Sequence, residues 1–117
     1  MSSHVLVRYS ESATIVECVD PKLSDEMTIQ AWSEEVVETI DKSFSQDRVI
    51  LSFSHVKFMS SSALRALITL RAKAEQKKIA LFLCDINAAN MEVFKITKLD
   101  SLFRITPTEL EAQRAML

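Results

Sequence analysis

Residues 49–64 read VILSFSHVKFMSSSAL, and this stretch decides the fold. The segment from Arg48 to Phe53, which includes the beginning of this stretch, is short, largely apolar and rich in strand-forming residues. It predicts a strand that is buried on both faces. From Ser62 to about Lys77, leucine, isoleucine and alanine recur at helical spacing. Three serines, residues 60–62, stand at the start of this helix, where serine is a favoured cap. The stretch therefore predicts a buried strand, a loop and a helix that begins at a serine cluster.

The segments on either side alternate between strands and helices. His4–Tyr9 and Ala13–Val19 are apolar and β-branched around the polar Ser10–Ser12, so they predict a hairpin. The other predicted elements are a helix from about 25 to 44 capped by Ser24, a buried strand Ile79–Cys84, a helix capped by Asn87 or Asp85, a short edge strand near Leu102–Ile105 and a helix starting at Pro107. This order predicts one α/β domain over residues 1–117, with a mixed sheet of four to five strands and about four amphipathic helices.

Composition excludes several classes of function. The 117 residues are 48% hydrophobic and 26% charged, which is typical of a globular protein. A net charge of -2 gives no reason to expect nucleic-acid binding. The longest apolar run, Ile79 to Cys84, is far below the roughly 20 residues that span a bilayer. No signal peptide is visible, so we expect a cytoplasmic protein without membrane insertion.

The sequence contains no glycine. Any position with a positive φ must therefore be occupied by Asn, Asp, Lys or a similar residue, at some cost in strain. Glycine-rich loops that cradle phosphates are excluded, and we expect neither nucleotide chemistry nor a cofactor. The two cysteines, Cys18 and Cys84, predict no disulfide framework and no metal site; both are expected to be buried in strands.

The opening stretch resembles the signature of STAS domains, the sulphate transporter and anti-sigma factor antagonist family. That signature is a buried strand ending in Asp-Leu-Ser, an apolar pair, and Asp-Ser-Ser-Gly-Leu at the start of a helix. Residues 96–105, ITKLDSLFRI, are similar to a second family segment that has Ser-Gly-Leu, Leu-Phe and a terminal Ile. The length of the chain is most like that of the free-standing bacterial regulators of transcription in this family.

The resemblance implies a phosphorylation switch. In anti-sigma factor antagonists, a partner that is both anti-sigma factor and serine kinase phosphorylates the first serine of Ser-Ser-Gly, which aligns with Ser61. The unmodified protein binds this partner, phosphorylation blocks binding, and a serine phosphatase restores it. The implied partner-binding residues are Lys22, Leu23, Ser24, Ser60, Ser61, Ser62, Ala63 and Arg65.

The physics of Ser61 is consistent with this role. Helix N-termini favour anions, and a phosphate adds about -1.5 to -2 charges, enough to disrupt a packed interface. Arg65, one turn later, can pair with such a phosphate or with an acid of the partner. Without the resemblance, the serine cluster would be interpreted as a plain helix cap.

Several residues depart from the family pattern. Ser24, Ser52 and Ser60 stand where the family has Asp, and Ala63 and Lys98 stand where it has Gly. The three serines in place of Asp favour an alternative, a phosphorylation-independent STAS subunit that scaffolds a larger complex such as a lipid-transport ATPase assembly.

An enzyme is not expected. His55 has no acid at an orienting position, so no catalytic triad and no metal ligands are proposed. Trp32 is expected in the core, and the oligomeric state is left open.

Overall fold

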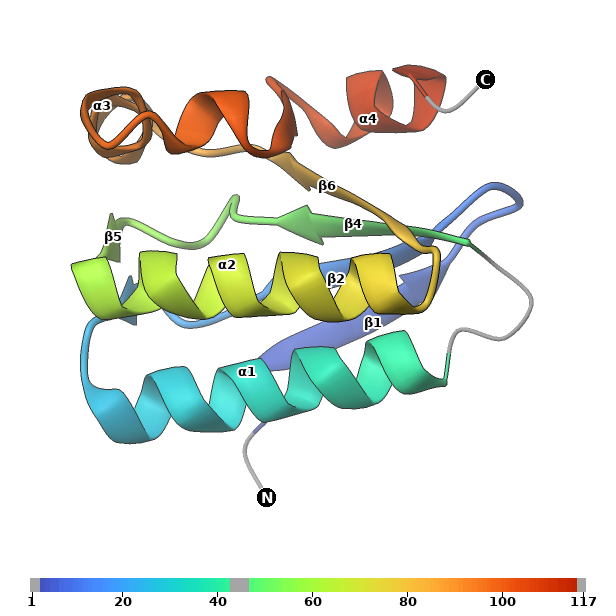
Figure 1. The fold of residues 1–117 in the computed structure, drawn as a ribbon, viewed down its shortest axis with the longest axis horizontal. Coiled ribbons are helices and arrows are strands. Elements are labelled where there is room, and N and C mark those ends of the chain that lie inside the picture. Colours follow the sequence, from blue (N-terminus) through green and yellow to red (C-terminus); the bar gives the residue numbers. More distant parts are fainter. Residues whose placement is uncertain (1–2, 43–46, 116–117) are drawn as a thin grey trace.

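The computed structural model describes residues 3–42 and 47–115, in which strands and helices alternate (Figure 1). The strands are β1 Val5–Tyr9, β2 Thr14–Cys18, β3 Lys22–Leu23, β4 Arg48–Ser52, β5 Phe58–Met59, β6 Ala80–Cys84 and β7 Arg104–Thr106. The helices are α1 Glu26–Asp41, α2 Ser61–Gln76, α3 Ala88–Ile96, the 3-10 turn η1 Leu99–Ser101 and α4 Glu109–Ala115. This order confirms the predicted α/β fold with its N-terminal hairpin.

Five strands form a mixed sheet in the order β1-β2-β4-β6-β7. Only β1 runs antiparallel to its neighbour, and β2, β4, β6 and β7 are parallel to one another. Helices α1 and α2 lie side by side on one face of the sheet, while α4 packs against the other (Figure 1). The carboxyl ends of the parallel strands and the N-termini of α1 and α2 therefore meet at the same end of the molecule.

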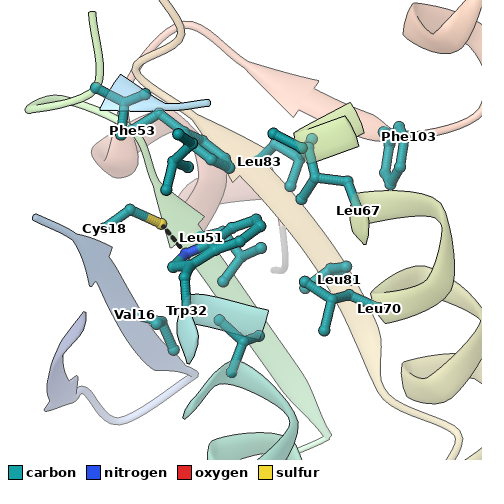
Figure 2. Close-up of a cluster of buried hydrophobic side chains, with 14 of the residues drawn as sticks. Val16, Cys18, Trp32, Leu51, Phe53, Leu67, Leu70, Leu81, Leu83 and Phe103 are labelled. Atoms are coloured by element: carbon teal, nitrogen blue, oxygen red, sulfur yellow. Dashed lines mark hydrogen bonds between the residues drawn. The ribbon is translucent and has the colours of Figure 1, made fainter. Parts of the chain in front are cut away.

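The larger part of the core lies between the sheet and helices α1 and α2 (Figure 2). Trp32 is fully buried there, its Nε1 donates to Cys18 Sγ at 3.2 Å, and its ring meets Phe53 edge to face at 6.5 Å. These contacts confirm that Trp32 and Cys18 belong to the core. Because water is excluded, burial raises the pKa of the Cys18 thiol to about 12.

A second, smaller cluster fills the opposite face of the sheet. Ile50 on β4 and Phe82 on β6 pack here with Ala112 of α4. Val49 and Leu51, their alternating neighbours on β4, point to the larger cluster. Strand β4 is thus buried on both faces, as its sequence predicts.

Within residues 3–42 and 47–115, three residues adopt a positive φ without being glycine: Lys78 (59°), Asp85 (59°) and Lys98 (62°). Lys98 follows Thr97, the C-cap of α3. The Lys98 N–H donates a hydrogen bond to the Lys95 carbonyl at 3.1 Å. Helices commonly end on such a left-handed residue, and the conformation costs a non-glycine residue about 1 kcal/mol. The expectation that Asn, Asp or Lys would fill these positions is confirmed.

Two predicted helix starts are wrong. Asp25, not Ser24, caps α1: its carboxylate accepts from Thr28 N–H at 2.9 Å, and a charged acceptor is the stronger cap. Helix α4 begins at Glu109 rather than at Pro107, because Thr108 Oγ1 accepts from Glu111 N–H at 3.2 Å and acts as the cap.

Smaller boundary differences concern the remaining elements. Helix α2 begins one residue earlier than predicted, at Ser61, and Asn87 rather than Asp85 caps α3. The edge strand is shifted to Arg104–Thr106. Helix α1 is described to Asp41, and the end predicted at residue 44 lies outside the described residues.

Candidate functional site

A short two-stranded ribbon brings together the two segments that carry the predicted site. Strands β3 and β5 pair in parallel, with Lys22 opposite Phe58 and Leu23 opposite Met59. Ser60 N–H then donates to the Leu23 carbonyl at 2.9 Å, which fixes the start of α2 against β3. The segments 22–24 and 60–65 are therefore one continuous surface.

Side chains alternate across this ribbon. Leu23 and Met59 are 0% and 4% exposed and point into the core, so Lys22 and Phe58 point outward, Phe58 being 50% exposed. The sequence pattern predicted no strand at residues 22–23 or 58–59 and so missed the ribbon. In the sequence, each of these strands is marked only by one apolar residue, Leu23 or Met59, beside polar or turn residues. A single apolar residue is too short a pattern to predict a strand.

The three serines at the start of α2 have three different environments. Ser60 is the N-cap, and its Oγ accepts from Ala63 N–H at 3.3 Å. Ser61 is the first helical residue and is exposed, and its hydroxyl makes no hydrogen bond within residues 3–42 and 47–115. Ser62 Oγ accepts from Arg65 Nη2 at 3.2 Å. Of the three, Ser61 presents the hydroxyl that is free to react.

The N-terminal end of α2 is electropositive. Its first turn contains no acidic residue, and the exposed Arg65 lies one turn into the helix, with its guanidinium held at Ser62. Backbone N–H groups that lack a helical partner and the helix dipole add positive potential at the same place. An anion attached to Ser61 would thus be stabilised by these N–H groups and by Arg65.

Helix α3 supports the loop that leads into the site. Asn87 Nδ2 and Asn90 Nδ2 both donate to the Lys57 carbonyl, at 3.1 and 3.3 Å. Asn90 is only 4% exposed, so this buried amide is satisfied by the loop that carries β5. Sequence reasoning missed these two asparagines as positioning residues, because their partner is a backbone atom some thirty residues away.

The serines at the family's aspartate positions have three different environments. Ser52 is buried at the end of β4, with its Oγ 3.5 Å from Asp85 Oδ2. Ser24 is exposed beside the Asp25 cap, and Ser60 is itself a cap. Leu23 and Ala63 are 0% exposed, so a partner at this surface would not touch them, and they act by holding their exposed neighbours in place.

No catalytic geometry surrounds Ser61 in the part of the chain that the structure describes. The expectation that His55 has no acid beside it is wrong, because its Nε2 lies 2.6 Å from Glu17 Oε1. Among the described residues, its ring makes no hydrogen bond to a serine. Among the described residues, no three His, Cys, Asp or Glu side chains are placed to hold a metal ion. The helices within residues 3–42 and 47–115 are all too short or too polar to cross a membrane.

The structure is a small α/β domain with an exposed serine at the start of α2. The STAS domain family model matches residues 10–112. The chain belongs to the STAS domain family.

Solved structures show the same fold at low sequence identity. The chain is similar to an anti-sigma-factor antagonist (STAS) domain protein from Planctomyces limnophilus, with 18% identity, 100% of each chain covered and a TM-score of 0.85. It is similar to an anti-sigma factor antagonist from Mycobacterium paratuberculosis, with 20% identity, 96% and 92% covered and a TM-score of 0.82. It also resembles the Bacillus cell fate determinant SpoIIAA in its phosphorylated form, with 16% identity, 97% and 99% covered and a TM-score of 0.68. A sequence search of curated proteins finds no match.

Proposed function

We propose that this chain is a non-enzymatic regulator of the anti-sigma factor antagonist type. It acts in the cytoplasm and binds a partner that is both anti-sigma factor and serine kinase. The contact surface is formed by Lys22, Ser24, Ser60, Ser61, Ser62 and Arg65, and the buried Leu23 and Ala63 support it from beneath. Phosphate on Ser61 ends the binding, and a serine phosphatase restores it.

The observation that carries the proposal is the environment of Ser61. Its exposed hydroxyl has no partner in the described structure, while the serines on both sides are hydrogen-bonded. It stands at the helix start that the β3–β5 ribbon joins to residues 22–24. A kinase can reach this oxygen without unfolding the helix cap.

A phosphate here would change the surface in two ways. It adds about -1.5 to -2 charges where the unmodified surface is positive, and desolvating that charge in an interface is costly. It also gives Arg65 a stronger partner than the Ser62 hydroxyl, so the guanidinium is no longer available to an acid of the binding partner. Both effects weaken an interface centred on Ser61.

The test combines peptide mapping with binding of three variants. Protein isolated from its native cells under phosphatase inhibition should carry phosphate on Ser61. In affinity capture, the wild type and Ser61→Ala should retain a partner with a serine-kinase domain, identified by mass spectrometry, and Ser61→Asp should lose it. Ser62→Asp is the matched control, with the same charge one residue along. If Ser62→Asp loses the partner as completely, or Ser61→Asp keeps it, the switch is not at Ser61.

A second candidate function is a phosphorylation-independent STAS subunit of a larger assembly, such as a lipid-transport ATPase complex. The residues at the aspartate positions of the family pattern favour it, because Ser24, Ser52 and Ser60 supply no carboxylate near Ser61. Absence of phosphate under several growth conditions, together with capture of a transporter ATPase by both the wild type and Ser61→Asp, would establish this alternative.

A further inference from the structure

An open groove of about 540 Å³ lies at the end of the sheet opposite to Ser61. It is formed at the amino ends of β4 and β6 and is bordered by Ala115, the last residue of α4. The residues that determine its chemistry are Asp47, Arg48, Lys78, Ala80, Phe82 and Arg104.

Strand register places two arginines on the same face around a small residue. Arg48 is opposite Ala80, and Phe82 is opposite Arg104, so these four side chains share the face covered by α4. Strands β4 and β7 lie on either side of β6 and are therefore about 10 Å apart. Because Ala80 is short, the space between the two arginines is left open above an apolar floor.

The cations of this groove lack close carboxylate partners. The Arg104 guanidinium lies 5.7 Å from the centre of the Phe82 ring, and within the described ranges neither Arg104 nor Lys78 forms an ion pair. Arg48 Nε is 3.8 Å from Asp47 Oδ1, at the limit of an ion pair, and the Asp47 side chain is 79% exposed.

Several other cations of the fold, by contrast, have close carboxylate partners. Arg8, Lys42 and Arg71 have carboxylate partners at 2.6, 2.6 and 2.9 Å. A neighbouring cavity of about 300 Å³ shares Lys78, Ala80 and Arg104 with the groove. Its one further cation, Arg71, is already bonded to Glu75 and to the Leu102 carbonyl. The larger groove adds Arg48 to the two shared cations, so three cations border Ala80 and Phe82 there.

We propose that this groove binds a small organic phosphate monoester. Three cations facing one exposed carboxylate favour a dianion, and planar guanidinium groups match the oxygens of a phosphate in a two-pronged arrangement. The side chains of Ala80 and Phe82 would contact the carbon skeleton of the ligand. Because the groove and Ser61 lie at opposite ends of the sheet, the ligand and a protein partner at Ser61 can be bound together.

The experiment is a titration of the full-length protein with phenyl phosphate, followed by backbone amide NMR. Shifts should concentrate on residues 80–82 and on Arg104. Arg48→Gln and Arg104→Gln should each weaken binding about tenfold, as for loss of a hydrogen bond between charged groups. Lys95→Gln, which removes an exposed cation of α3, is the matched control and should bind like the wild type. Undisturbed spectra of the unliganded variants would show that they are folded.

Three results would overturn the proposal. Shifts confined to residues 61–64 would place phosphate at the N-terminus of α2 instead. An equal loss of affinity in Lys95→Gln would show that the weaker binding of the arginine variants is due to their lower net charge and not to lost contacts in the groove. Inorganic phosphate binding as tightly as phenyl phosphate would show that the apolar floor makes no contact with a ligand.

Discussion

Replacing Ser60 and Ser61 separately by alanine tests whether one serine caps the helix while the other is free. Ser60 Oγ accepts from Ala63 N–H at 3.3 Å, and alanine leaves that donor without its partner. Loss of a serine N-cap costs about 1 kcal/mol of the free energy of unfolding. For a domain of this size, that corresponds to a fall in Tm of about 4 °C.

Ser61→Ala should behave differently. The side chain is exposed and its hydroxyl has no hydrogen bond within residues 3–42 and 47–115, so the change in unfolding free energy should stay within about 0.5 kcal/mol. Urea unfolding followed by circular dichroism measures both variants. The slope of free energy against urea should be the same in both, since neither change alters the surface exposed on unfolding. If Ser61→Ala is as destabilising as Ser60→Ala, the assignment of cap and free hydroxyl is wrong.

Three other changes test separate parts of the structure. Hydrogen bonds from Thr28 lower the pKa of Asp25 below its ordinary 3.8. The stabilisation that this carboxylate provides is therefore fully present above pH 3.8 and is lost as the pH falls through the lowered pKa. Asparagine at this position caps the helix without titrating, so acid unfolding of Asp25→Asn should depend less on pH below about 4. Since burial raises the pKa of Cys18 to about 12, the thiol should not react with a disulfide reagent at pH 8 until urea unfolds the chain, and rapid labelling of the native protein would contradict its burial. Lys98→Gly should raise the free energy of unfolding by up to about 1 kcal/mol, because glycine adopts the positive φ at this position without strain, whereas Lys95→Gly in α3 should lower it.

Elements with long periodic patterns could be predicted from the sequence. The alternation of Val49, Ile50 and Leu51 between two buried clusters follows from a continuous apolar run, and the helical spacing of Ile29, Trp32 and Val36 places them in the core. In each case, many residues follow the same hydrophobic pattern, so a single residue that departs from it does not change the predicted element.

Features made by two or three residues could not be predicted in the same way. The β3–β5 ribbon depends on a pairing between segments some 35 positions apart, and two-residue strands carry no periodicity. The choice of Asp25 over Ser24 as cap depends on which side chain reaches Thr28 N–H, which is a matter of backbone geometry. The side-chain amides of Asn87 and Asn90 both donate to a backbone carbonyl. Because every residue has such a carbonyl, the sequence does not indicate which one is the partner.

Because Ser60, the N-cap of α2, is uncharged, a phosphate on Ser61 would meet a different electrostatic environment from the one beside an aspartate cap. An aspartate at position 60 would neutralise part of the positive potential of the α2 N-terminus and would repel a phosphate on the next residue. With Ser60 in that place and no acid in the first turn, a phosphate on Ser61 would be the first anion at this helix end. It would meet the free N–H groups and Arg65 without a like charge beside it, so phosphorylation should stabilise α2 while it alters the surface. The serine substitutions that favour a constitutive subunit are, on electrostatic grounds, also compatible with a phosphorylated Ser61.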